Sequence, residues 1–247
     1  MSIEIQMIGT GSAFAKRYFN NNAIVRAGNF QLLIDCGISA PLALYQLRID
    51  LTSINAILIT HIHADHVGGL EEIAFRMKFI HQCKPVLYVP SALANPLWDA
   101  TLRGGMEDLQ SGGDSLSSYF DVRLMEEGLP VQIADGLKAE LLLTKHVPGK
   151  TSYSVLLNDS LFYTSDMTFD ADLLAKLVET GRCRHILHDC QLQGLPRVHT
   201  VLDQLMTLPA SLQERIWLMH YGDDMEQFIG KTGKMRFIEQ HRRYTFK

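Results

Sequence analysis

The chain has 247 residues, of which 47% are hydrophobic and 20% charged, as expected for a globular protein with a large core. Its net charge of −4 argues against a stable nucleic-acid partner, because phosphate contacts usually need an excess of Lys and Arg. The first residues lack the features of a secretory signal, and no apolar run approaches the roughly 18 residues that cross a bilayer. We therefore expect a cytoplasmic protein without a membrane segment.

Apolar runs along the chain predict alternating strands and helices. The predicted strands are 3–8, 23–27, 30–34, 54–59, 86–89, 131–133, 137–144, 154–157, 161–163 and 215–219. The predicted helices are 39–48, 69–80, 171–180 and 200–205. We find no internal repeat or low-complexity linker, so we expect a single domain, 1–247, of the α/β class.

One segment, 95–119, interrupts this regular pattern. It contains Pro96, two Gly pairs and a run of Ser, which predict a long inserted loop. A loop of this length inside a compact domain is usually functional or disordered.

The most informative motif is His61-Ile62-His63-Ala64-Asp65-His66, which directly follows the predicted strand 54–59. Three imidazoles and a carboxylate at the end of a strand can point at one place, and this donor set suits zinc. A solvated, His-rich loop is the alternative, but four ligand-type residues so close together make it improbable.

Further ligands are expected later in the chain, because one short loop cannot complete a coordination shell. His146, Asp166 and His220 each follow an apolar run, at a position where a strand would end. Alone, each is weak evidence for a ligand. The order in which these three residues follow the first motif is more specific evidence for a metal site than any one of them.

This ordered set resembles the metallo-β-lactamase superfamily along most of the chain. The resemblance implies a four-layer αβ/βα sandwich with two divalent metal ions, zinc or alternatively manganese, at one edge. It also implies the division of the ligands: His61, His63 and His146 for one ion, Asp65, His66 and His220 for the other, and Asp166 as the bridge. A metal pair can lower the pKa of a water molecule and stabilise charge on a phosphoryl oxygen, so hydrolysis is the expected chemistry and Asp65 counts among the expected catalytic residues.

A second set of motifs is similar to the ribonuclease Z-like branch, which cleaves phosphodiesters. These motifs are residues 8–13, Asp35-Cys36-Gly37 and His188-Asp189-Cys190-Gln191. The resemblance implies that His188 is the general acid that protonates the leaving alkoxide and that Asp189 orients it. The alternative is that His188 ends a strand and bonds to the backbone. The HDCQ sequence departs from the HEAT pattern of the tRNA-processing enzymes.

Residues 11–23, the His-rich motif with the following Gly68-Gly69-Leu70-Glu71-Glu72, and residues 102–106 resemble the anti-Pycsar proteins. This resemblance implies a phosphodiesterase that hydrolyses 3′,5′-cyclic nucleotides and acts as a homodimer, in which a loop of one subunit completes the other's pocket. Segment 95–119 is the candidate loop. Trp98 and Tyr119 are expected to stack on a base or to lie at a dimer interface, and Arg103 to pair with a phosphate. Equally, the aromatic rings can pack beneath the loop.

Three other functions stay open at this point. The chain could be a ribonuclease Z-like RNA 3′-processing endonuclease or another cyclic-phosphate diesterase. Redox relatives of the superfamily need a flavin partner or a different iron shell, and no flavin-binding extension is visible. A non-catalytic protein that sequesters a nucleotide is the alternative from a different class, and the intact ligand set argues against it.

Overall fold

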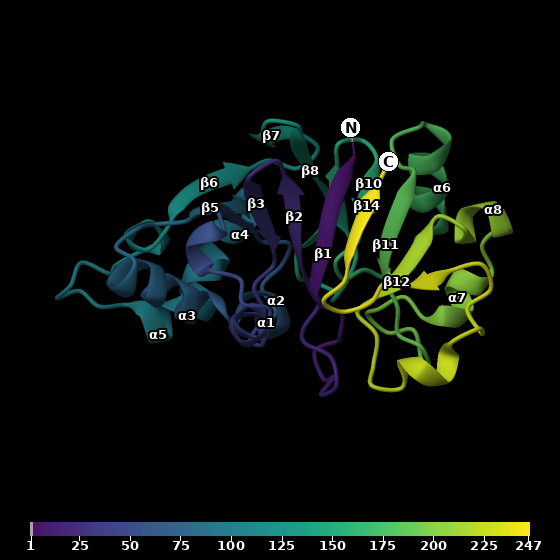
Figure 1. Ribbon diagram of the computed structural model, residues 1–247, viewed down its shortest axis with the longest axis horizontal. Helices are drawn as coiled ribbons and strands as arrows, with labels where there is room; N and C mark the ends of the chain where they lie inside the picture. Colours follow the sequence, from purple (N-terminus) through teal and green to yellow (C-terminus); the bar gives the residue numbers. More distant parts are fainter. Residues whose placement is uncertain (1) are drawn as a thin grey trace.

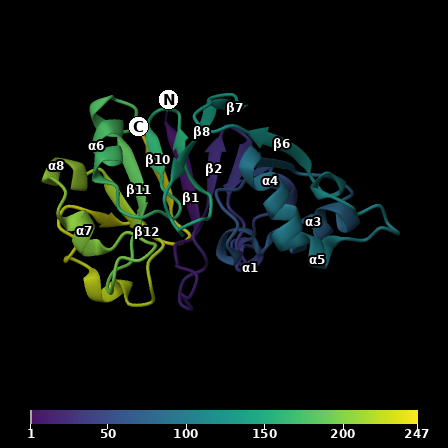
Figure 2. The same cartoon turned by 180° about the vertical axis from the view of Figure 1, so that it is seen from behind.

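Two mixed β-sheets of seven strands each face one another between outer helices in the computed structural model, which describes residues 2–247. Figures 1 and 2 show helices α1 to α5 grouped beside the first sheet and helices α6 to α8 beside the second. This arrangement confirms the four-layer αβ/βα sandwich that was predicted.

The first sheet has the strand order β14-β1-β2-β3-β4-β5-β6. Its strands are β1 (Ile3–Gly9), β2 (Asn22–Ala27), β3 (Phe30–Ile34), β4 (Ala56–Leu58), β5 (Val86–Pro90), β6 (Asp121–Met125) and β14 (Arg243–Phe246). The helices on its side are α1 (Ala40–Gln46), α2 (Ala64–Val67), α3 (Leu70–Phe75), α4 (Ser91–Leu97) and α5 (Arg103–Met106). Strands β3 to β6 run parallel, so their carboxyl ends meet at one edge.

The second sheet has the order β13-β12-β11-β10-β9-β8-β7. Its strands are β7 (Val131–Ala134), β8 (Leu137–Thr144), β9 (Ser152–Leu157), β10 (Leu161–Tyr163), β11 (His185–Asp189), β12 (Ile216–Met219) and β13 (Arg236–Phe237). Helices α6 (Ala171–Glu179), α7 (Leu202–Met206) and α8 (Ala210–Gln213) lie on its outer side. Strands β10 to β13 are parallel, which brings their carboxyl ends together as well.

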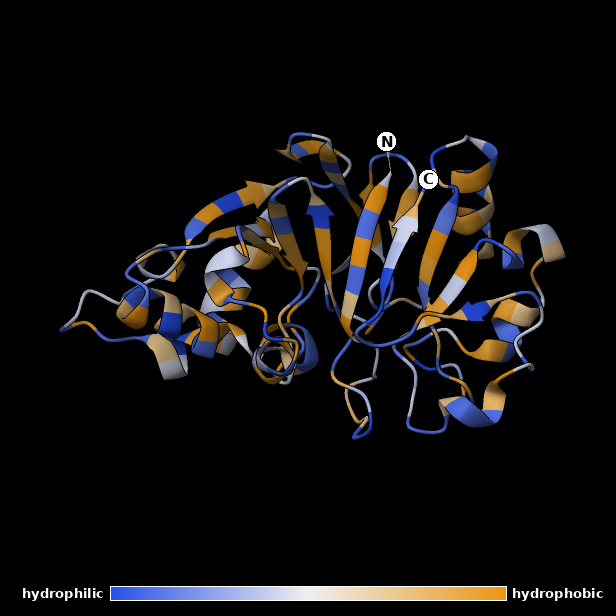
Figure 3. Cartoon of the chain, in the orientation of Figure 1, coloured by the Kyte–Doolittle hydropathy of each residue, from blue (hydrophilic) through white to orange (hydrophobic). Residues whose placement is uncertain are grey.

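Two apolar cores hold these layers together. The larger one contains buried residues of both sheets, such as Ile5, Val155 and Leu187, and therefore lies between them. The smaller one joins the outer face of the second sheet to its helices through residues such as Ile186 and Leu205. In Figure 3 the strands carry the strongest hydrophobic colouring, as expected for sheets covered on both faces.

The segment 95–119, called the arm below, is not the continuous loop that was predicted. It contains the last residues of helix α4, a π-helical turn at Trp98–Leu102 and helix α5, and a short hairpin follows α5. Pro96 lies inside α4, and Gly104 and Gly105 lie inside α5. The arm projects from the body of the molecule beyond the first sheet (Figures 1 and 2).

The sequence pattern did not predict four strands: β6, β11, β13 and β14. Strand β6 is largely exposed and strand β14 is an edge strand, so neither needs a long apolar run. Strand β11 is short and begins and ends with polar residues, His185 and Asp189. Within residues 2–247, no helix is long and apolar enough to cross a membrane.

Candidate metal centre and adjoining pocket

All seven predicted ligands lie at one edge of the two sheets, called the metal edge below. The His-rich motif follows β4 and begins helix α2, while the later ligands follow β8, β10 and β12. Side chains far apart in the chain meet here because parallel strands end at a common edge. The ligand-type side chains form two groups: His61, His63, His146 and Asp166, and Asp65, His66, Asp166 and His220.

The first group combines three imidazoles with one carboxylate oxygen. The Nδ1 atom of His63 lies 3.1 Å from Nε2 of His61 and 3.3 Å from Nε2 of His146. Both Nε2 atoms lie 3.7 Å from Oδ2 of Asp166. Ligand atoms of a tetrahedral zinc site, with bonds of about 2.0–2.2 Å, lie roughly 3.3–3.6 Å apart. The spacing therefore fits a small divalent cation.

The second group has two imidazoles and two carboxylates. His66 Nε2 lies 3.2 Å from Oδ2 of Asp65 and 3.4 Å from Oδ2 of Asp166. His220 Nε2 lies 3.4 Å from Oδ2 of Asp65 and 3.4 Å from Oδ1 of Asp166. Asp166 thus contributes to both groups, the position predicted for a bridging ligand.

Unpartnered polar atoms in both groups and the lowered pKa of the imidazoles in the first group support divalent cation binding. Within residues 2–247, His66 Nε2 and Asp166 Oδ1 are buried without a hydrogen-bond partner, an arrangement that is rare unless a further group is bound. Burial lowers the pKa of His61 and His146, which keeps their nitrogen lone pairs free. Burial would raise the pKa of Asp166, but the charges of His220 and His66 hold it well below its usual range.

Hydrogen bonds on the far side of the imidazoles fix which nitrogen faces the centre. Asp35 accepts from His66 Nδ1 at 2.8 Å, and the carbonyl of Val198 accepts from His146 Nδ1 at 2.7 Å. Asp35 also accepts from the backbone N–H and the hydroxyl of Thr60, each at 2.8 Å. Its fully buried carboxylate therefore joins the His-rich motif to strand β3.

Backbone strain and close packing also occur at this edge. Asp35, Ser165 and His220 have φ values of 58°, 51° and 56°, in the left-handed region that non-glycine residues rarely adopt. A Cβ at Gly37 would lie 1.9 Å from the carbonyl oxygen of Asp65, so only glycine lets the two loops approach. These features hold the ligand loops in one arrangement.

His188, the predicted general acid, lies away from both ligand groups. It is fully buried in strand β11, and its Nδ1 atom bonds to the carbonyl of Asp189 at 2.8 Å. Successive residues of a strand face opposite sides. His188 shares its side with Ile186 and Cys190, which belong to the outer core beneath the helices. This geometry matches the backbone-bonded alternative. Nδ1 of His188 also lies 3.1 Å from Oδ1 of Asp189, the predicted orienting contact, but His188 belongs to neither ligand group.

Asp189 points to the other side of β11 and meets a histidine that the sequence analysis missed, His199. The Nδ1 atom of His199 donates to Oδ2 of Asp189 at 3.1 Å and lies 3.9 Å from Oδ2 of Asp166. Asp189, His199 and His220 form a third cluster of ligand-type residues. The His199 ring stacks on that of His220 with 4.8 Å between their centroids.

The loop that carries His199 is anchored on both sides. Thr200 donates its N–H and its hydroxyl to the carbonyl of Met167, next to Asp166, and its own carbonyl accepts from Gln191. Burial alone would lower the pKa of His199, but the hydrogen bond to Asp189 and the charge of Asp166 raise it above its ordinary value. His199 remains partly exposed, with 21% of its side chain accessible. The sequence offers only a general signal for it, since His199 and His185 are the two unassigned histidines between Asp166 and His220.

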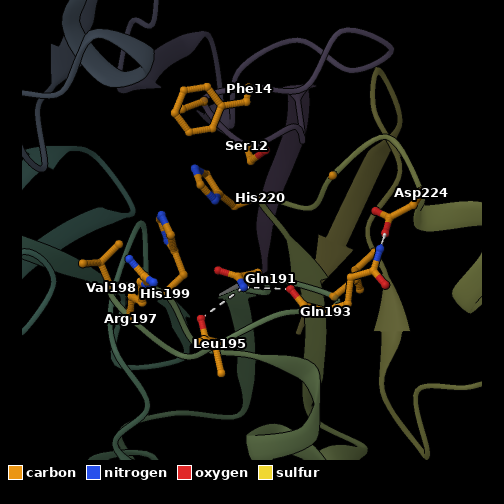
Figure 4. A pocket seen from close by; sticks show the side chains of 13 residues that line it. Ser12, Phe14, Gln191, Gln193, Leu195, Arg197, Val198, His199, His220 and Asp224 are labelled. Carbon is orange, nitrogen blue, oxygen red and sulfur yellow. Dashed lines mark hydrogen bonds between the residues drawn. The ribbon is translucent and has the colours of Figure 1, made fainter.

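A cavity of about 580 Å³ opens directly beside His199 and His220 (Figure 4). Its other walls come from the loop after β1, which includes Phe14, and from residues 191–198 and 222–224. A volume in this range is typical of small-molecule sites. The partly exposed imidazole of His199 thus faces a space that can hold a substrate.

The predicted substrate-binding residues of the arm do not reach this cavity within one chain. Trp98 is 8% exposed and Tyr119 is fully buried, and their ring centroids lie 6.4 Å apart. Tyr119 also donates its hydroxyl to the carbonyl of Met106. Arg103 is exposed and forms an ion pair with Glu107 at 2.9 Å. The aromatic rings therefore follow the packing alternative, inside the arm.

Comparison with solved structures supports the fold. The metallo-β-lactamase fold protein YhfI from Bacillus subtilis superimposes with a TM-score of 0.76, covering 99% of each chain at 15% sequence identity. An identity this low shows the shared architecture alone.

Sequence comparison identifies the family. The profile of the family described as Anti-Pycsar protein Apyc1 matches residues 3–244. An anti-Pycsar protein Apyc1 of Paenibacillus xerothermodurans is 56% identical over 246 residues, which cover 100% of this chain and 98% of the relative. Another, from Bacillus phage BSP38, is 43% identical and covers 98% of this chain and 97% of its own length. The chain therefore belongs to the anti-Pycsar protein Apyc1 family.

Proposed function

We propose that this protein is a metal-dependent phosphodiesterase that hydrolyses 3′,5′-cyclic mononucleotides to nucleoside monophosphates and thereby counters Pycsar defence. The name shared by its relatives supports the biological role. The observation that carries the chemistry is the pair of ligand groups that share Asp166, beside a cavity bordered by His199.

We assign His61, His63 and His146 to one metal ion, Asp65, His66 and His220 to a second, and Asp166 to both. The imidazole-rich donor set favours zinc, and the three carboxylate contacts leave manganese as the alternative. When bound, such a metal pair supplies Lewis-acid stabilisation of the phosphoryl charge and activates water as the nucleophile.

The ribose oxygen that leaves the phosphorus is a poor leaving group, so a proton must reach it as the bond breaks. We assign this general-acid role to His199 instead of His188, because His199 borders the cavity and His188 does not. Asp189 accepts from Nδ1 of His199 and so leaves the Nε2–H available for donation to the ribose oxygen. Asp189 is then a positioning residue, and its buried carboxylate also stabilises the charged imidazole.

Product analysis tests this proposal. The purified protein is loaded with zinc or manganese and incubated with cyclic mononucleotides, 2′,3′-cyclic phosphates and precursor tRNA, and the products are separated by chromatography. Conversion of the 3′,5′-cyclic compounds to monophosphates is the expected result. Processing of precursor tRNA with no cyclic-nucleotide turnover would favour an RNA 3′-processing endonuclease, and tight binding without products would favour a sequestering protein.

We further propose that the protein acts as a homodimer in which the arm of one subunit approaches the pocket of the other. The arm projects from the body of the molecule (Figures 1 and 2), and Leu109 at its tip is 72% exposed. Two backbone hydrogen bonds between Asp108 and Gly113 close the tip into a hairpin, which gives the tip a defined shape for contact with a second subunit. Light scattering at micromolar concentration tests the assembly, and a monomer would contradict it.

A further inference from the structure

We propose that Asn21 and Tyr163 form a hydrogen-bonded pair, called the inter-sheet pair below, that sets the distance between the two halves of the metal edge. Asn21 directly precedes β2 in the first sheet, and Tyr163 ends β10 in the second. Both side chains are fully buried, and neither is assigned to a metal ion, so they are positioning residues. The proposal rests on the proposed function, since it needs the metal assignment made there.

Each ligand group takes side chains from both sheets, so its geometry depends on how far apart the sheets lie. His66 comes from the segment after β4 of the first sheet and Asp166 from the segment after β10 of the second, and their Nε2 and Oδ2 atoms lie 3.4 Å apart. His63 and His146 are related in the same way, with 3.3 Å between Nδ1 and Nε2. Because metal–ligand bond lengths are held to within about 0.2 Å, a small change in sheet spacing should weaken metal binding.

Two reciprocal hydrogen bonds make up the inter-sheet pair. Asn21 Nδ2 donates to the hydroxyl of Tyr163 at 3.0 Å, and that hydroxyl donates to the backbone carbonyl of Asn21 at 3.3 Å. Asn21 Nδ2 also lies 3.5 Å from Sδ of Met219. One side chain of the first sheet therefore contacts the ends of β10 and β12, the two strands that lead to Asp166 and His220.

The asparagines on either side of Asn21 hold the other half of the metal edge. Oδ1 of Asn22 accepts from the backbone N–H of Gly37 at 3.0 Å, and Oδ1 of Asn20 accepts from the N–H and the hydroxyl of Ser39 at 3.0 and 2.8 Å. Gly37 in turn packs against the backbone carbonyl of Asp65, a ligand. The run of three asparagines thus connects the loop beneath the His-rich motif to the second sheet.

Stability alone does not explain why this pair is polar. A buried hydrogen-bonded pair gains little over apolar side chains of the same shape, and within residues 2–247 Asn21 Oδ1 is buried without a partner, which costs free energy. Burial, together with the charges of Asp35 and Asp166, raises the pKa of Tyr163, so its hydroxyl stays protonated and can donate. Hydrogen bonds have a preferred distance and direction, which apolar contacts lack. The pair therefore contributes geometry more than stability.

The central test replaces both partners with apolar side chains of similar shape, Asn21→Leu combined with Tyr163→Phe. Because no polar group loses its partner in this double variant, its melting temperature should stay within about 3 °C of the wild type. Its affinity for manganese should fall about 10-fold, measured by chelator titration with elemental analysis. Tyr119→Phe, which removes a buried hydroxyl bond to the carbonyl of Met106 in the arm, is the matched control and should leave metal affinity unchanged.

Two further readouts separate positioning from general stability. The EPR spectrum of the protein loaded with two manganese ions reports their magnetic coupling through the bridging ligand, and the double variant should show altered coupling at full occupancy. The single variant Tyr163→Phe leaves the Asn21 N–H without its oxygen acceptor, so it should lower the melting temperature more than the double variant does. In both variants cyclic-nucleotide kcat should fall about 10-fold with little change in KM, as expected when the reacting groups are misplaced.

The outcomes distinguish the inter-sheet pair from the proposed function. Wild-type metal affinity and coupling in the double variant would overturn the pair. Metal affinity that only follows the melting temperature across the single and double variants would assign the pair to stability and overturn it as well. If the metal-loaded wild type hydrolyses no cyclic phosphate, the proposed function fails, and the manganese titration still decides the pair. A wild-type protein that binds no metal would overturn both.

Discussion

The metal edge and the arm differ in the kind of contacts that build them. At the metal edge, side chains from Asp35 to His220 meet across both sheets. In the arm, the contacts are local, such as Trp98 with Tyr119 and Arg103 with Glu107. The sequence analysis grouped the ligand-type residues of the metal edge as the structure does. For the aromatic residues of the arm it left two alternatives open, and the structure follows the packing one.

The difference arises from chemistry. Three imidazoles and a carboxylate within six residues have few roles besides metal binding, so residue type alone is informative at the metal edge. An aromatic ring in the arm can stack on a ligand or pack in a core, and only its burial separates the two. Nothing in the residue pattern of 95–119 reveals that Trp98 and Tyr119 are buried.

The largest effect should come from Asp166→Ala, because Asp166 contributes to both ligand groups at the metal edge. We expect cyclic-nucleotide turnover to fall by about 10³-fold or more and metal content to drop, since the metal pair supplies several kcal/mol of transition-state stabilisation. Elemental analysis and product chromatography measure the two effects, and circular dichroism checks the fold. Two bound ions with unchanged turnover would show that Asp166 is not the bridge.

The next largest loss of activity is expected from replacing His199, the proposed proton donor. His199→Ala should reduce cyclic-nucleotide kcat about 10²-fold, the usual range for general acid catalysis, but spare hydrolysis of a nitrophenyl phosphodiester, whose leaving group needs no proton. The comparison variant His188→Ala removes a buried side chain whose Nδ1 lies 3.1 Å from Oδ1 of Asp189, so it should lower stability and change the ratio of the two activities less than His199→Ala does. The reverse pattern, a changed ratio for His188→Ala alone, would return the acid role to His188.

The prediction for His188 depends on a feature of the fold that the sequence does not reveal. Asp189, which was predicted to orient His188, lies at the metal edge beside His199 and His220. Whether His188 or Asp189 faces the site depends on the register of strand β11 in its sheet. The sequence analysis did not predict this strand, so it had no basis for assigning the register. His199 comes from a loop whose path is fixed by Thr200 and Met167, a contact no local pattern encodes.

A smaller effect is expected at Asp35, which lies behind the ligands and holds His66 through a 2.8 Å hydrogen bond. Asp35→Asn should lower metal affinity about 10- to 100-fold, because the amide is a weaker acceptor that can no longer fix the ring orientation of His66 or raise its basicity as a ligand. A chelator titration followed by elemental analysis measures this. Asp50→Asn, an exposed helix cap away from the centre, serves as the control. Unchanged affinity in Asp35→Asn would limit Asp35 to holding the loops together.

The smallest effect, and the one that most sharpens the contrast with the metal edge, is expected at the tip of the arm. Replacing residues 109–112 with Asn-Gly keeps the pairing of Asp108 with Gly113 and shortens the exposed hairpin between them. If the tip reaches a partner's pocket, cyclic-nucleotide kcat/KM should fall about 3- to 10-fold while a small nitrophenyl phosphodiester is cleaved as before, since only the larger substrate gains binding energy from a remote contact.

The control for this variant is Arg103→Ala, which removes exposed ion pairs from the arm and should change the free energy of unfolding by less than about 1 kcal/mol. Light scattering on both proteins then separates assembly from catalysis. A shortened arm that leaves a fully active monomer would contradict the shared pocket and would leave the metal edge and its cavity as a site complete within one chain. A dimer with a selective loss on cyclic nucleotides would instead show that the arm, whose aromatic residues pack inward, acts through its outer surface on a second copy.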